Sequence, residues 1–334
     1  MKNPMIRRPW VITIAVVGFS GLLWGIFSGL LEFKNKDFSK KSNGAIENLA
    51  TEEFWKPPDS TAIPANAEGD LIRYGRELIA HTAVYLGPKG KVRAISNGMN
   101  CQNCHLNAGK VPFGNNYGAV ATKYPTFRSR SGTIENYEKR VNDCIERSLN
   151  GLSLDSTSQE MRAIVAYLKW VGKDVPKGKS PPGLGLLTPN FLDRPADPLK
   201  GALVYQKHCT SCHGEDGEGV LAENGLEWKY PPLYGDKSYS IGAGLYRLSL
   251  FAGFVKFNMP YGTNFEKPTL TDEEAWDVAA YVNSKQRPHK DISMDWPDIT
   301  KKPFDHPFGP YADSFPEYQH KFGPFTVIKE SISN

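Results

Sequence analysis

The chain has 334 residues, and its 40 Lys and Arg residues against 36 Asp and Glu residues leave a net charge of only +4. This mild charge, without a long basic run, argues against a nucleic-acid-binding protein. The absence of a GxxxxGK[ST] or GxGxxG loop leaves nucleotide binding without support. Hydrophobic residues at 40% and charged residues at 23% exclude a mainly disordered chain. The 31 glycines and 25 prolines predict a fold rich in turns and loops.

The amino terminus carries Lys2, Arg7 and Arg8 before an uncharged stretch of 22 residues, Trp10–Leu31. A helix of that length spans about 33 Å, which is enough for a hydrocarbon core of about 30 Å. Positive charge before the span keeps the amino terminus in the cytoplasm and places the remainder outside. We therefore expect residues 1–33 to be a transmembrane anchor in the cytoplasmic (inner) membrane, with a signal peptide as the alternative. Both alternatives export the rest of the chain to the periplasm or another extracytoplasmic space.

Four of the five cysteines occur in two copies of one motif, Cys101-Gln-Asn-Cys104-His105 and Cys209-Thr-Ser-Cys212-His213. Cys-x-x-Cys-His is the attachment signature of c-type haem, in which two thiols reach the vinyl groups and the next residue presents its imidazole to the iron. A zinc site needs four ligands together, and a redox dithiol does not need the histidine. The motifs predict two covalently bound haem c groups with the proximal ligands His105 and His213.

The remaining sequence repeats one order of elements around each motif, namely a helix, the cysteine motif, loops and a closing helix. We expect these helices over Gly69–Ala80, Ser158–Val171, Asp197–His208 and Thr271–Lys285. Between the two units, Gly172–Pro189 holds four glycines and four prolines and marks the boundary. The predicted fold is therefore mainly α, with two tandem, loop-rich cytochrome c-type domains behind the amino-terminal helix.

The expected divisions follow from this order. The carboxyl-terminal part is rich in Pro, Phe and Tyr, and we expect its aromatic side chains to pack across the body because a disordered tail would normally lack them. The divisions are a tether over 34–68, a first domain with the catalytic haem over 69–175, a linker over 176–196, a second domain with the electron-transfer haem over 197–290, and a wrapping tail over 291–334.

The distal ligand of the second haem is predicted from the segment that follows His213. Met259 lies 46 residues after His213 and is followed directly by Pro260. This arrangement is typical of the distal methionine of small c-type cytochromes, and His/Met ligation raises the reduction potential. We expect Met259 to ligate this iron, and Lys256 and His208 are weaker alternative ligands. The structural alternative is that Met259 is a core residue and binds no iron.

The first motif has no such Met-Pro loop. Met161 falls on the apolar stripe of a predicted helix and is expected in the core, so that His81 and the fifth cysteine, Cys144, remain as distal candidates. Cys144 lies in a helix expected over Thr133–Asn150, with Thr133 as its cap. A buried inert thiol is the structural alternative for Cys144.

Cys144 lies between Arg140 and Ser148, each four residues away, so the three side chains share one stripe of the helix. Arg147 returns within about 20° of Arg140. Nearby arginines lower the pKa of a thiol, and guanidinium groups bind oxyanions through paired donors. The stripe favours a reactive thiolate beside an anion site. Upstream cations that could complete this site are Lys123, Arg128 and Arg130.

At these motifs the sequence resembles the dihaem thiosulfate dehydrogenases, over roughly Gly69 to Phe325. The resemblance is carried by Asn100-Cys-Gln-Asn-Cys-His105, Cys144-Ile-Glu-Arg-Ser-Leu-Asn-Gly151, Asn258-Met-Pro-Tyr-Gly262, Phe308-Gly-Pro-Tyr311 and Gln319-His-Lys-Phe-Gly-Pro-Phe325. The family couples two thiosulfate anions to tetrathionate, and the direction of the reaction stays open here, as does the exact sulfur oxyanion.

The resemblance implies that Cys144 is the sixth ligand of the first haem and the catalytic residue, and that Arg130, Arg140 and Ser148 belong to the active site. It implies that thiosulfate attaches to Cys144 through its outer sulfur and that a second thiosulfate then releases tetrathionate. Electrons would pass from the His/Cys haem to the His/Met haem and on to an external acceptor, such as a soluble cytochrome or a membrane redox protein.

Two features depart from the family pattern. Some members carry a lysine directly before the distal methionine and exchange the two ligands, whereas Asn258 stands there in this chain, so we expect steady His213/Met259 ligation. Soluble members are familiar, whereas this chain begins with a long apolar span. The alternative functions are a membrane-anchored dihaem electron-transfer cytochrome without its own catalysis, and a structural haem subunit that docks a separate catalytic partner.

Overall fold

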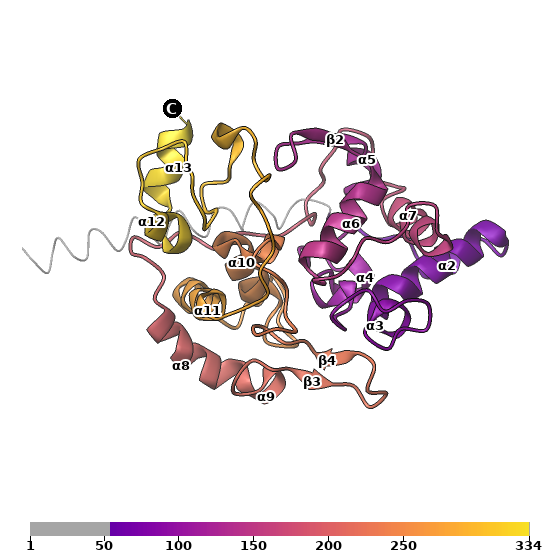
Figure 1. Ribbon diagram of the computed structural model, residues 1–334, viewed down its shortest axis with the longest axis horizontal. Helices are drawn as coiled ribbons and strands as arrows, with labels where there is room; N and C mark the ends of the chain where they lie inside the picture. The colour runs from indigo at the N-terminus through magenta and orange to yellow at the C-terminus, as the bar shows by residue number, and fades with distance from the viewer. Residues whose placement is uncertain (1–53, 334) are drawn as a thin grey trace, which may run out of the picture. The chain divides into compact units, whose positions relative to one another are not determined.

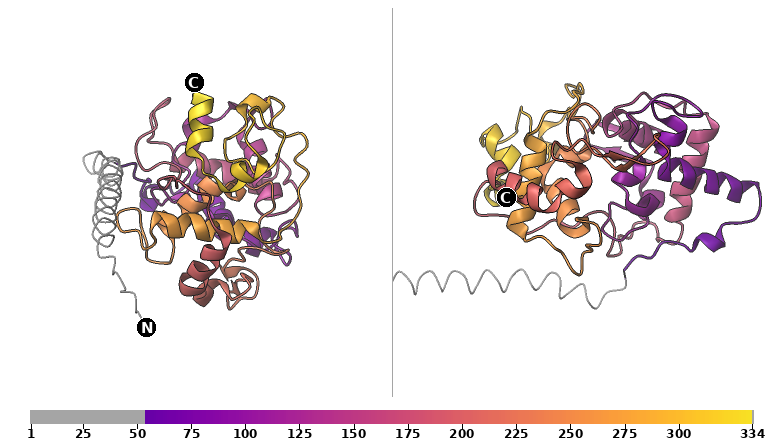
Figure 2. Two further views of the ribbon diagram at one scale, coloured as in Figure 1. Left: turned by 90° about the vertical axis from the view of Figure 1, so that its left-hand side faces the viewer. Right: turned by 90° about the horizontal axis from the view of Figure 1, so that it is seen from below.

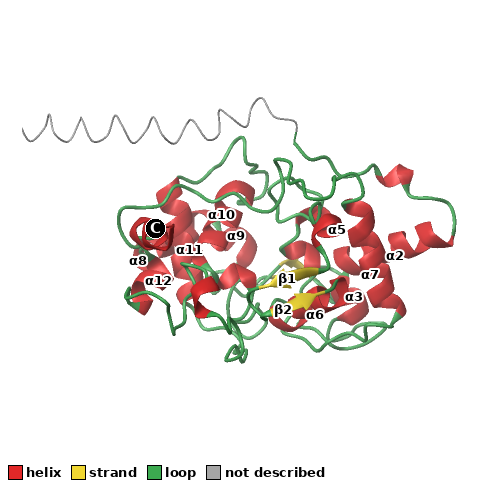
Figure 3. Ribbon diagram, turned by 90° about the horizontal axis from the view of Figure 1, so that it is seen from above, coloured by secondary structure: helices red, strands yellow, loops and turns green. Residues whose placement is uncertain are grey.

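The computed structural model describes residues 54–333. They form helices and loops with two short two-stranded antiparallel sheets. Figure 3 shows the helices in red, the loops in green and one of the strand pairs in yellow. The anchor predicted over residues 1–33, and the tether as far as residue 53, lie outside the described part. Among the described residues, no helix combines the length and the apolarity needed to cross a membrane. The anchor stays a prediction from the sequence.

The described chain has a first lobe, residues 54–175, and a second lobe, residues 197–333, joined by the linker over 176–196. Figure 1 shows the first lobe in indigo to magenta and the second in salmon to yellow. The first lobe contains α2 (Ala67–Ala80), α3 (Thr82–Leu86), α4 (Leu106–Gly109), α5 (Val120–Lys123), β1 (Thr126–Arg128), β2 (Thr133–Glu135), α6 (Tyr137–Arg147) and α7 (Gln159–Val171). The second lobe contains α8 (Pro198–His208), α9 (Thr210–His213), β3 (Val220–Leu221), β4 (Trp228–Tyr230), α10 (Leu248–Asn258), α11 (Asp272–Ser284), α12 (Glu317–Phe322) and α13 (Thr326–Ser333).

Each lobe is built on a close crossing of its first and closing helices, α2 with α7 and α8 with α11. A Cβ atom on Gly75 of α2 would lie 1.9 Å from the carbonyl oxygen of Ala163 in α7. A Cβ atom on Gly201 of α8 would likewise lie 1.9 Å from the carbonyl oxygen of Asp277 in α11. Only glycine permits such an approach of two helix backbones. The repeated order of elements is therefore matched by a repeated packing device.

The four helices expected at these crossings are confirmed, with ends set by local capping. Ser158 caps α7 by accepting a hydrogen bond from the Met161 amide at 3.1 Å. Thr271 and Glu274 form a reciprocal capping box at the start of α11, with distances of 3.1 and 2.9 Å. Such caps satisfy amide groups that the first helical turn leaves without partners.

The helix that carries Cys144 starts later than expected, so the prediction that it begins at a Thr133 cap is wrong. Thr133 instead begins β2, where it pairs with Arg128 of β1, because β-branched Thr and Ile suit an extended strand. Asn136 is the N-cap of α6 and accepts a hydrogen bond from the Lys139 amide at 2.9 Å. Ser148 is the C-cap residue that follows α6.

Helix α10 was missed because it shows no polar face from which to read a period. Nine of its eleven residues are buried, and a helix that is apolar all round lies inside a protein. It packs against α11 in the core of the second lobe. Phe325 and Ile328 of the tail lie in the same core, and Figure 2 shows the yellow carboxyl-terminal helix beside the orange helices.

The described part of the expected tether, from Phe54 to α2, is mostly exposed but contacts the first lobe at two points. Trp55 and Ile63 are buried in the core of the first lobe. The Trp55 amide donates to the carbonyl of Pro182 at 2.8 Å, which ties this segment to the linker. Burial of two large apolar side chains explains why this stretch is ordered despite its polar composition.

Candidate active site

The first Cys-x-x-Cys-His motif begins in a tight 3-10 turn over Cys101–Asn103. The Asn100 amide donates to the Asn103 side chain at 2.7 Å, and the Cys101 amide donates to the hydroxyl of Thr82 at 3.0 Å. The His105 amide donates to the carbonyl of Cys101 at 3.0 Å. These hydrogen bonds hold both thiols and the imidazole on one compact turn.

Both motif histidines are oriented through Nδ1. His105 Nδ1 lies 2.5 Å from the carbonyl oxygen of Asn115, and His213 Nδ1 lies 2.8 Å from that of Pro231. Since a carbonyl oxygen only accepts, Nδ1 carries the proton and Nε2 is left with a free lone pair. Burial lowers the pKa of His105 to about 4 and also lowers the pKa of His213. Both imidazoles are therefore neutral, as an iron ligand must be.

Cys144 lies beside the first motif. Burial raises the pKa of Cys101 to about 11 and that of Cys104 to about 12, and the negative charge of a Cys144 thiolate adds to both effects. The three sulfurs are therefore within electrostatic reach of one another. A cysteine that is not needed for attachment thus lies next to the predicted position of the first haem.

The donor set fits haem rather than a bare metal ion. Within residues 54–333, no group of three or more His, Cys, Asp or Glu side chains could hold an ion. A porphyrin supplies four nitrogen ligands to the iron, so the protein needs to supply only one or two axial ligands. Each lobe offers two thiols and one oriented, neutral imidazole, which is the set that a covalently attached haem requires.

Arg140 is the cation next to Cys144. The negative charge of a Cys144 thiolate is the main cause that raises the pKa of Arg140 above its ordinary value. Ser148 follows Cys144 by one turn, and its amide donates to the Cys144 carbonyl at 2.8 Å. The structure thus brings the predicted thiol and guanidinium together on one helix, with the hydroxyl of Ser148 at its end.

Arg130 enters this site from the turn between β1 and β2. Its Nη1 lies 3.4 Å from the carbonyl oxygen of Gly242 in the second lobe. Burial, followed by repulsion from Arg147, lowers the pKa of Arg130 to about 10, and Arg140 adds to the repulsion. The three guanidinium groups therefore form one cationic cluster, which is the kind of environment that binds a small oxyanion.

Two of the suggested cations lie against carboxylates, and a third is exposed to solvent. Arg147 was expected on the anion-binding stripe, but its guanidinium forms two hydrogen bonds with the Asp295 carboxylate at 2.7 and 2.6 Å. Arg128 lies 3.8 Å from a carboxylate oxygen of Glu135. Lys123 is exposed. Asp295 was missed because its partner lies 148 positions away in the sequence.

In the second lobe, Met259 is the residue that caps the carboxyl end of α10, and it packs against the core. Lys256, the weaker alternative ligand, is engaged elsewhere, since its Nζ lies 2.6 Å from the carbonyl of Leu270 and 3.1 Å from Asp272. The Asn258 amide group donates to the carbonyl of Phe113 at 3.2 Å. Ligation of the iron by Met259 stays a prediction. The contacts of Lys256 make replacement of Met259 by Lys256 as the iron ligand less favourable.

The other distal candidates of the first lobe are also placed by the structure. Met161 is fully buried in the core, as expected. His81 points to the second lobe, where its Nδ1 lies 3.0 Å from Glu227. Cys144 therefore remains the distal candidate beside the first motif.

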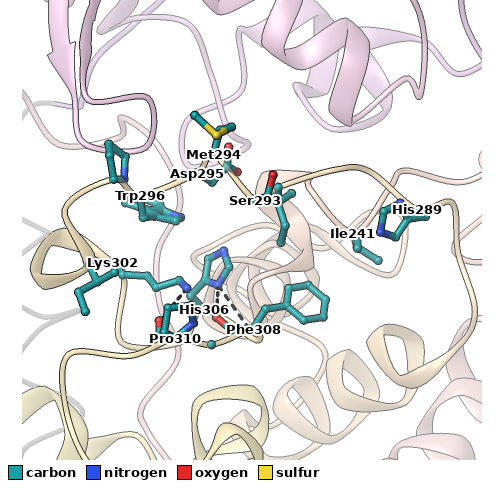
Figure 4. Close-up of a pocket in the computed structure, with 14 residues that line it drawn as sticks. Ile241, His289, Ser293, Met294, Asp295, Trp296, Lys302, His306, Phe308 and Pro310 are labelled. Atoms are coloured by element: carbon teal, nitrogen blue, oxygen red, sulfur yellow. Dashed lines mark hydrogen bonds between the residues drawn. The ribbon is translucent and has the colours of Figure 1, made fainter.

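A cavity of about 630 Å³ lies on the tail side of this site (Figure 4). Trp296, Lys302 and His306 line it together with Asp295. A much smaller cavity, lined by Arg130, shares Asp295 and His306 with it. Neither cavity is lined by Cys144.

Comparison with known proteins agrees with this arrangement. Residues 91–176 match the family described as SoxA/TsdA, cytochrome c domain, and residues 199–286 match cytochrome c. A thiosulfate dehydrogenase of Stutzerimonas stutzeri is 34% identical over 257 residues, covering 77% of this chain and 80% of that protein. That of Allochromatium vinosum is 36% identical over 239 residues, covering 69% and 83%. The chain belongs to the thiosulfate dehydrogenase family.

A solved structure supports the same membership. The thiosulfate dehydrogenase TsdBA of Marichromatium purpuratum, in its as-isolated form, is similar with a TM-score of 0.65 and 31% sequence identity. The similarity covers 72% of this chain and 51% of that one, so this thiosulfate dehydrogenase family member spans about half of the solved chain. The two cytochrome c domains indicate two covalently bound haem c groups, one in each lobe.

Proposed function

We propose that this protein is a dihaem thiosulfate dehydrogenase that joins two thiosulfate anions into tetrathionate, with Cys144 as the catalytic residue. One observation carries the proposal, namely that Cys144 and Arg140 lie one turn apart on α6, within electrostatic reach of the attachment thiols of the first motif. A thiolate is the nucleophilic form of cysteine, and the cationic cluster favours the binding of a dianionic substrate.

The proposed reaction balances in two steps. In the first, the Cys144 thiolate and the outer sulfur of one thiosulfate form a sulfur–sulfur bond, and two electrons leave. In the second, the outer sulfur of another thiosulfate attacks the sulfur attached to Cys144. The Cys144–sulfur bond breaks, tetrathionate leaves, and the thiolate returns. No proton is taken up or released, so the protein needs to hold the anions and the thiolate rather than supply an acid.

The chain's own residues would do this as follows. Arg130 and Arg140 would hold the sulfonate oxygens through charge-assisted hydrogen bonds. Ser148, at the end of α6, would offer a hydroxyl donor to the same group. When bound, the two haem groups accept the electrons one at a time. The methionine predicted in the second lobe would give its haem the higher reduction potential.

The path of the electrons and the location of the protein belong to this proposal. We infer that electrons pass from the first lobe to the second and then to an external acceptor, such as a soluble cytochrome or a membrane redox protein. The basic start and the uncharged span Trp10–Leu31 support a location at the cytoplasmic membrane, with both lobes outside the cytoplasm. Attachment of c-type haem outside the cytoplasm agrees with export.

Replacement of Cys144 by Ser tests the function. Thiosulfate-dependent reduction of an added acceptor should fall at least about 1000-fold, as when the nucleophile of a covalent mechanism is removed. Tetrathionate should no longer accumulate. Leu152→Ser is the matched control, because Leu152 lies just after α6 and its side chain is 69% exposed. Wild-type turnover in Cys144→Ser would contradict the proposal and favour a simple electron carrier.

A further inference from the structure

The tail brings one carboxylate to the cationic cluster of the first lobe. Asp295 lies on the segment between α11 and α12, and Figure 4 shows it beside Trp296 and Met294 at the edge of the cavity. Its two oxygens accept hydrogen bonds from Nη1 and Nη2 of Arg147 at 2.7 and 2.6 Å. The side chains of Asp295 and Arg147 are only 10% and 14% exposed, so this pair is largely removed from water.

The same tail segment also fixes Arg130. The Trp296 amide donates to the Arg130 carbonyl at 2.7 Å, and the Arg130 guanidinium carbon lies 5.8 Å from the centre of the Trp296 ring. Arg130 Nε lies 4.0 Å from Asp295. Trp296 has a φ of +60°, which a bulky residue rarely adopts. Trp296 therefore has an unfavourable backbone conformation in the segment that contacts Arg130 and Arg147.

A further segment of the second lobe contacts the same carboxyl end of α6. The amide and hydroxyl of Ser240 donate to the Arg147 carbonyl at 3.0 and 2.8 Å. A Cβ atom on Gly242 would lie 3.0 Å from Nη1 of Arg147. Arg147 is therefore enclosed by backbone on one side and by Asp295 on the other, so its guanidinium is directed at the carboxylate.

This geometry changes the charge that the cluster presents to a ligand. Arg147, Arg140 and Arg128 repel Arg130, and Asp295 is the carboxylate that offsets this repulsion. Arg128 lies 3.8 Å from a carboxylate oxygen of Glu135. Because Arg147 is neutralised by a bidentate pair, two guanidinium groups are left for an anion. Two positive charges match one dianion.

We propose that Asp295 is a positioning residue that acts as an internal counter-anion, pairing with Arg147 so that Arg130 and Arg140 are left to bind a single sulfur oxyanion dianion. The inference rests on the proposed function and goes beyond it, since it assigns the charge capacity of the site to a tail residue of the second lobe. Asp295 touches neither the thiol nor, on this account, the substrate.

Two opposite substitutions test the proposal with sulfate as the probe, because sulfate is an inert tetrahedral dianion of similar size to thiosulfate. Asp295→Asn leaves one more unpaired positive charge, so sulfate should inhibit thiosulfate oxidation about ten-fold more strongly. Arg147→Gln frees the carboxylate to compete for Arg130, so sulfate should inhibit about ten-fold more weakly and the KM for thiosulfate should rise. A merely structural pair would move both variants in the same direction.

A second readout does not depend on turnover. Sulfate should raise the thermal midpoint of holo Asp295→Asn more than that of the wild type, and that of Arg147→Gln less, because at a given concentration a ligand that binds more tightly stabilises the fold more. Asp295→Glu should restore the wild-type response. The control is Asp291→Asn, on the same segment, where Asp291 is exposed and accepts a hydrogen bond from the Ser293 amide at 2.9 Å.

Each outcome decides the matter. Unchanged sulfate responses in both variants, or shifts of the same sign, would overturn the counter-anion role. If Asp295→Asn fails to fold, Arg147→Gln still carries the test, since an unchanged or stronger response to sulfate in that variant contradicts the proposal. Failure of the proposed function is distinguished by the wild type, which would then show no thiosulfate turnover while the thermal measurements still report on Asp295.

Discussion

The two lobes share a scaffold and differ on the side that faces the predicted position of the haem. Both cross two helices at a glycine, and both anchor the motif histidine to a backbone carbonyl through Nδ1. In the first lobe, the distal helix α6 carries Cys144 and a row of charged side chains, and only two of its residues are buried. In the second lobe, α10 is almost wholly buried and is followed directly by Met259.

This difference teaches where function is located in the molecule. The scaffold holds the attachment thiols and the imidazole in the same way in both lobes, so it does not distinguish an enzyme site from an electron carrier. On the proposed function, the helix predicted on the distal side does so, because it provides either a thiol among cations or a methionine among apolar residues. A polar distal side admits anions, whereas an apolar side excludes water and favours a steady redox centre.

Substitution of the two crossing glycines, Gly75 and Gly201, tests the scaffold that the lobes share. Gly75→Ala and Gly201→Ala should each lower the free energy of unfolding by about 3 kcal/mol, because the new Cβ would overlap a backbone oxygen. Denaturant unfolding of each holo variant, followed by haem absorbance, measures the loss. Gly244→Ala is the control, since a Cβ there meets nothing within 4 Å. Stability equal to the control would show that the crossings can relax.

Substitution of Arg140 tests whether the anion site belongs to the first lobe. Arg140→Gln should lower kcat/KM for thiosulfate about 100-fold, because one charge-assisted hydrogen bond to a dianion is lost. Absorbance of the second haem should not change. The matched control is Arg162→Gln, since Arg162 is exposed on α7. An effect no larger than in Arg162→Gln would remove Arg140 from the site.

A smaller effect is expected at Glu227, which connects the lobes. Glu227 lies between β3 and β4 and accepts hydrogen bonds from Asn100 at 2.8 Å and Asn224 at 3.1 Å, with His81 at 3.0 Å. Burial raises the pKa of Glu227, but these hydrogen bonds outweigh it and leave the pKa below its ordinary value. Its stabilisation is therefore present above the unfolded pKa of about 4.3 and is lost as pH falls through the folded value.

Glu227→Gln should therefore cost about 1 kcal/mol of stability near neutral pH, a modest value because solvent screens part of the interaction. The cost should vanish in acid. Unfolding at a series of pH values measures it, with exposed Glu223→Gln of the same loop as the control. A cost that does not depend on pH would mean that the carboxylate charge plays no part in joining the lobes.

The sequence predicted the parts of the fold that depend on local signals. The four crossing helices were found because each combines an apolar stripe with a cap such as Ser158 or Thr271. Helix α10 was missed because a fully apolar helix shows no period. Thr133 was assigned to a helix because Thr is a good cap, but pairing with β1 placed it in a strand.

The candidate site also has a part that the sequence predicted and a part that it did not. The spacing of Arg140, Cys144 and Ser148 predicted a shared helical stripe because these residues are close in sequence. The pairing of Arg147 with Asp295 could not be predicted, since it joins residues 148 positions apart through the folding of the tail onto α6. Local spacing thus places side chains on a face, whereas tertiary contacts decide which charges remain available.

Low-temperature electron paramagnetic resonance of the oxidised full-length holoprotein tests the central claim that the lobes differ in the sulfur beside the iron. The account predicts two low-spin signals, one of the thiolate-ligated kind and one of the His/Met kind, and the first alone should disappear in Cys144→Ser. A spectrum that Cys144→Ser leaves unchanged would contradict the account.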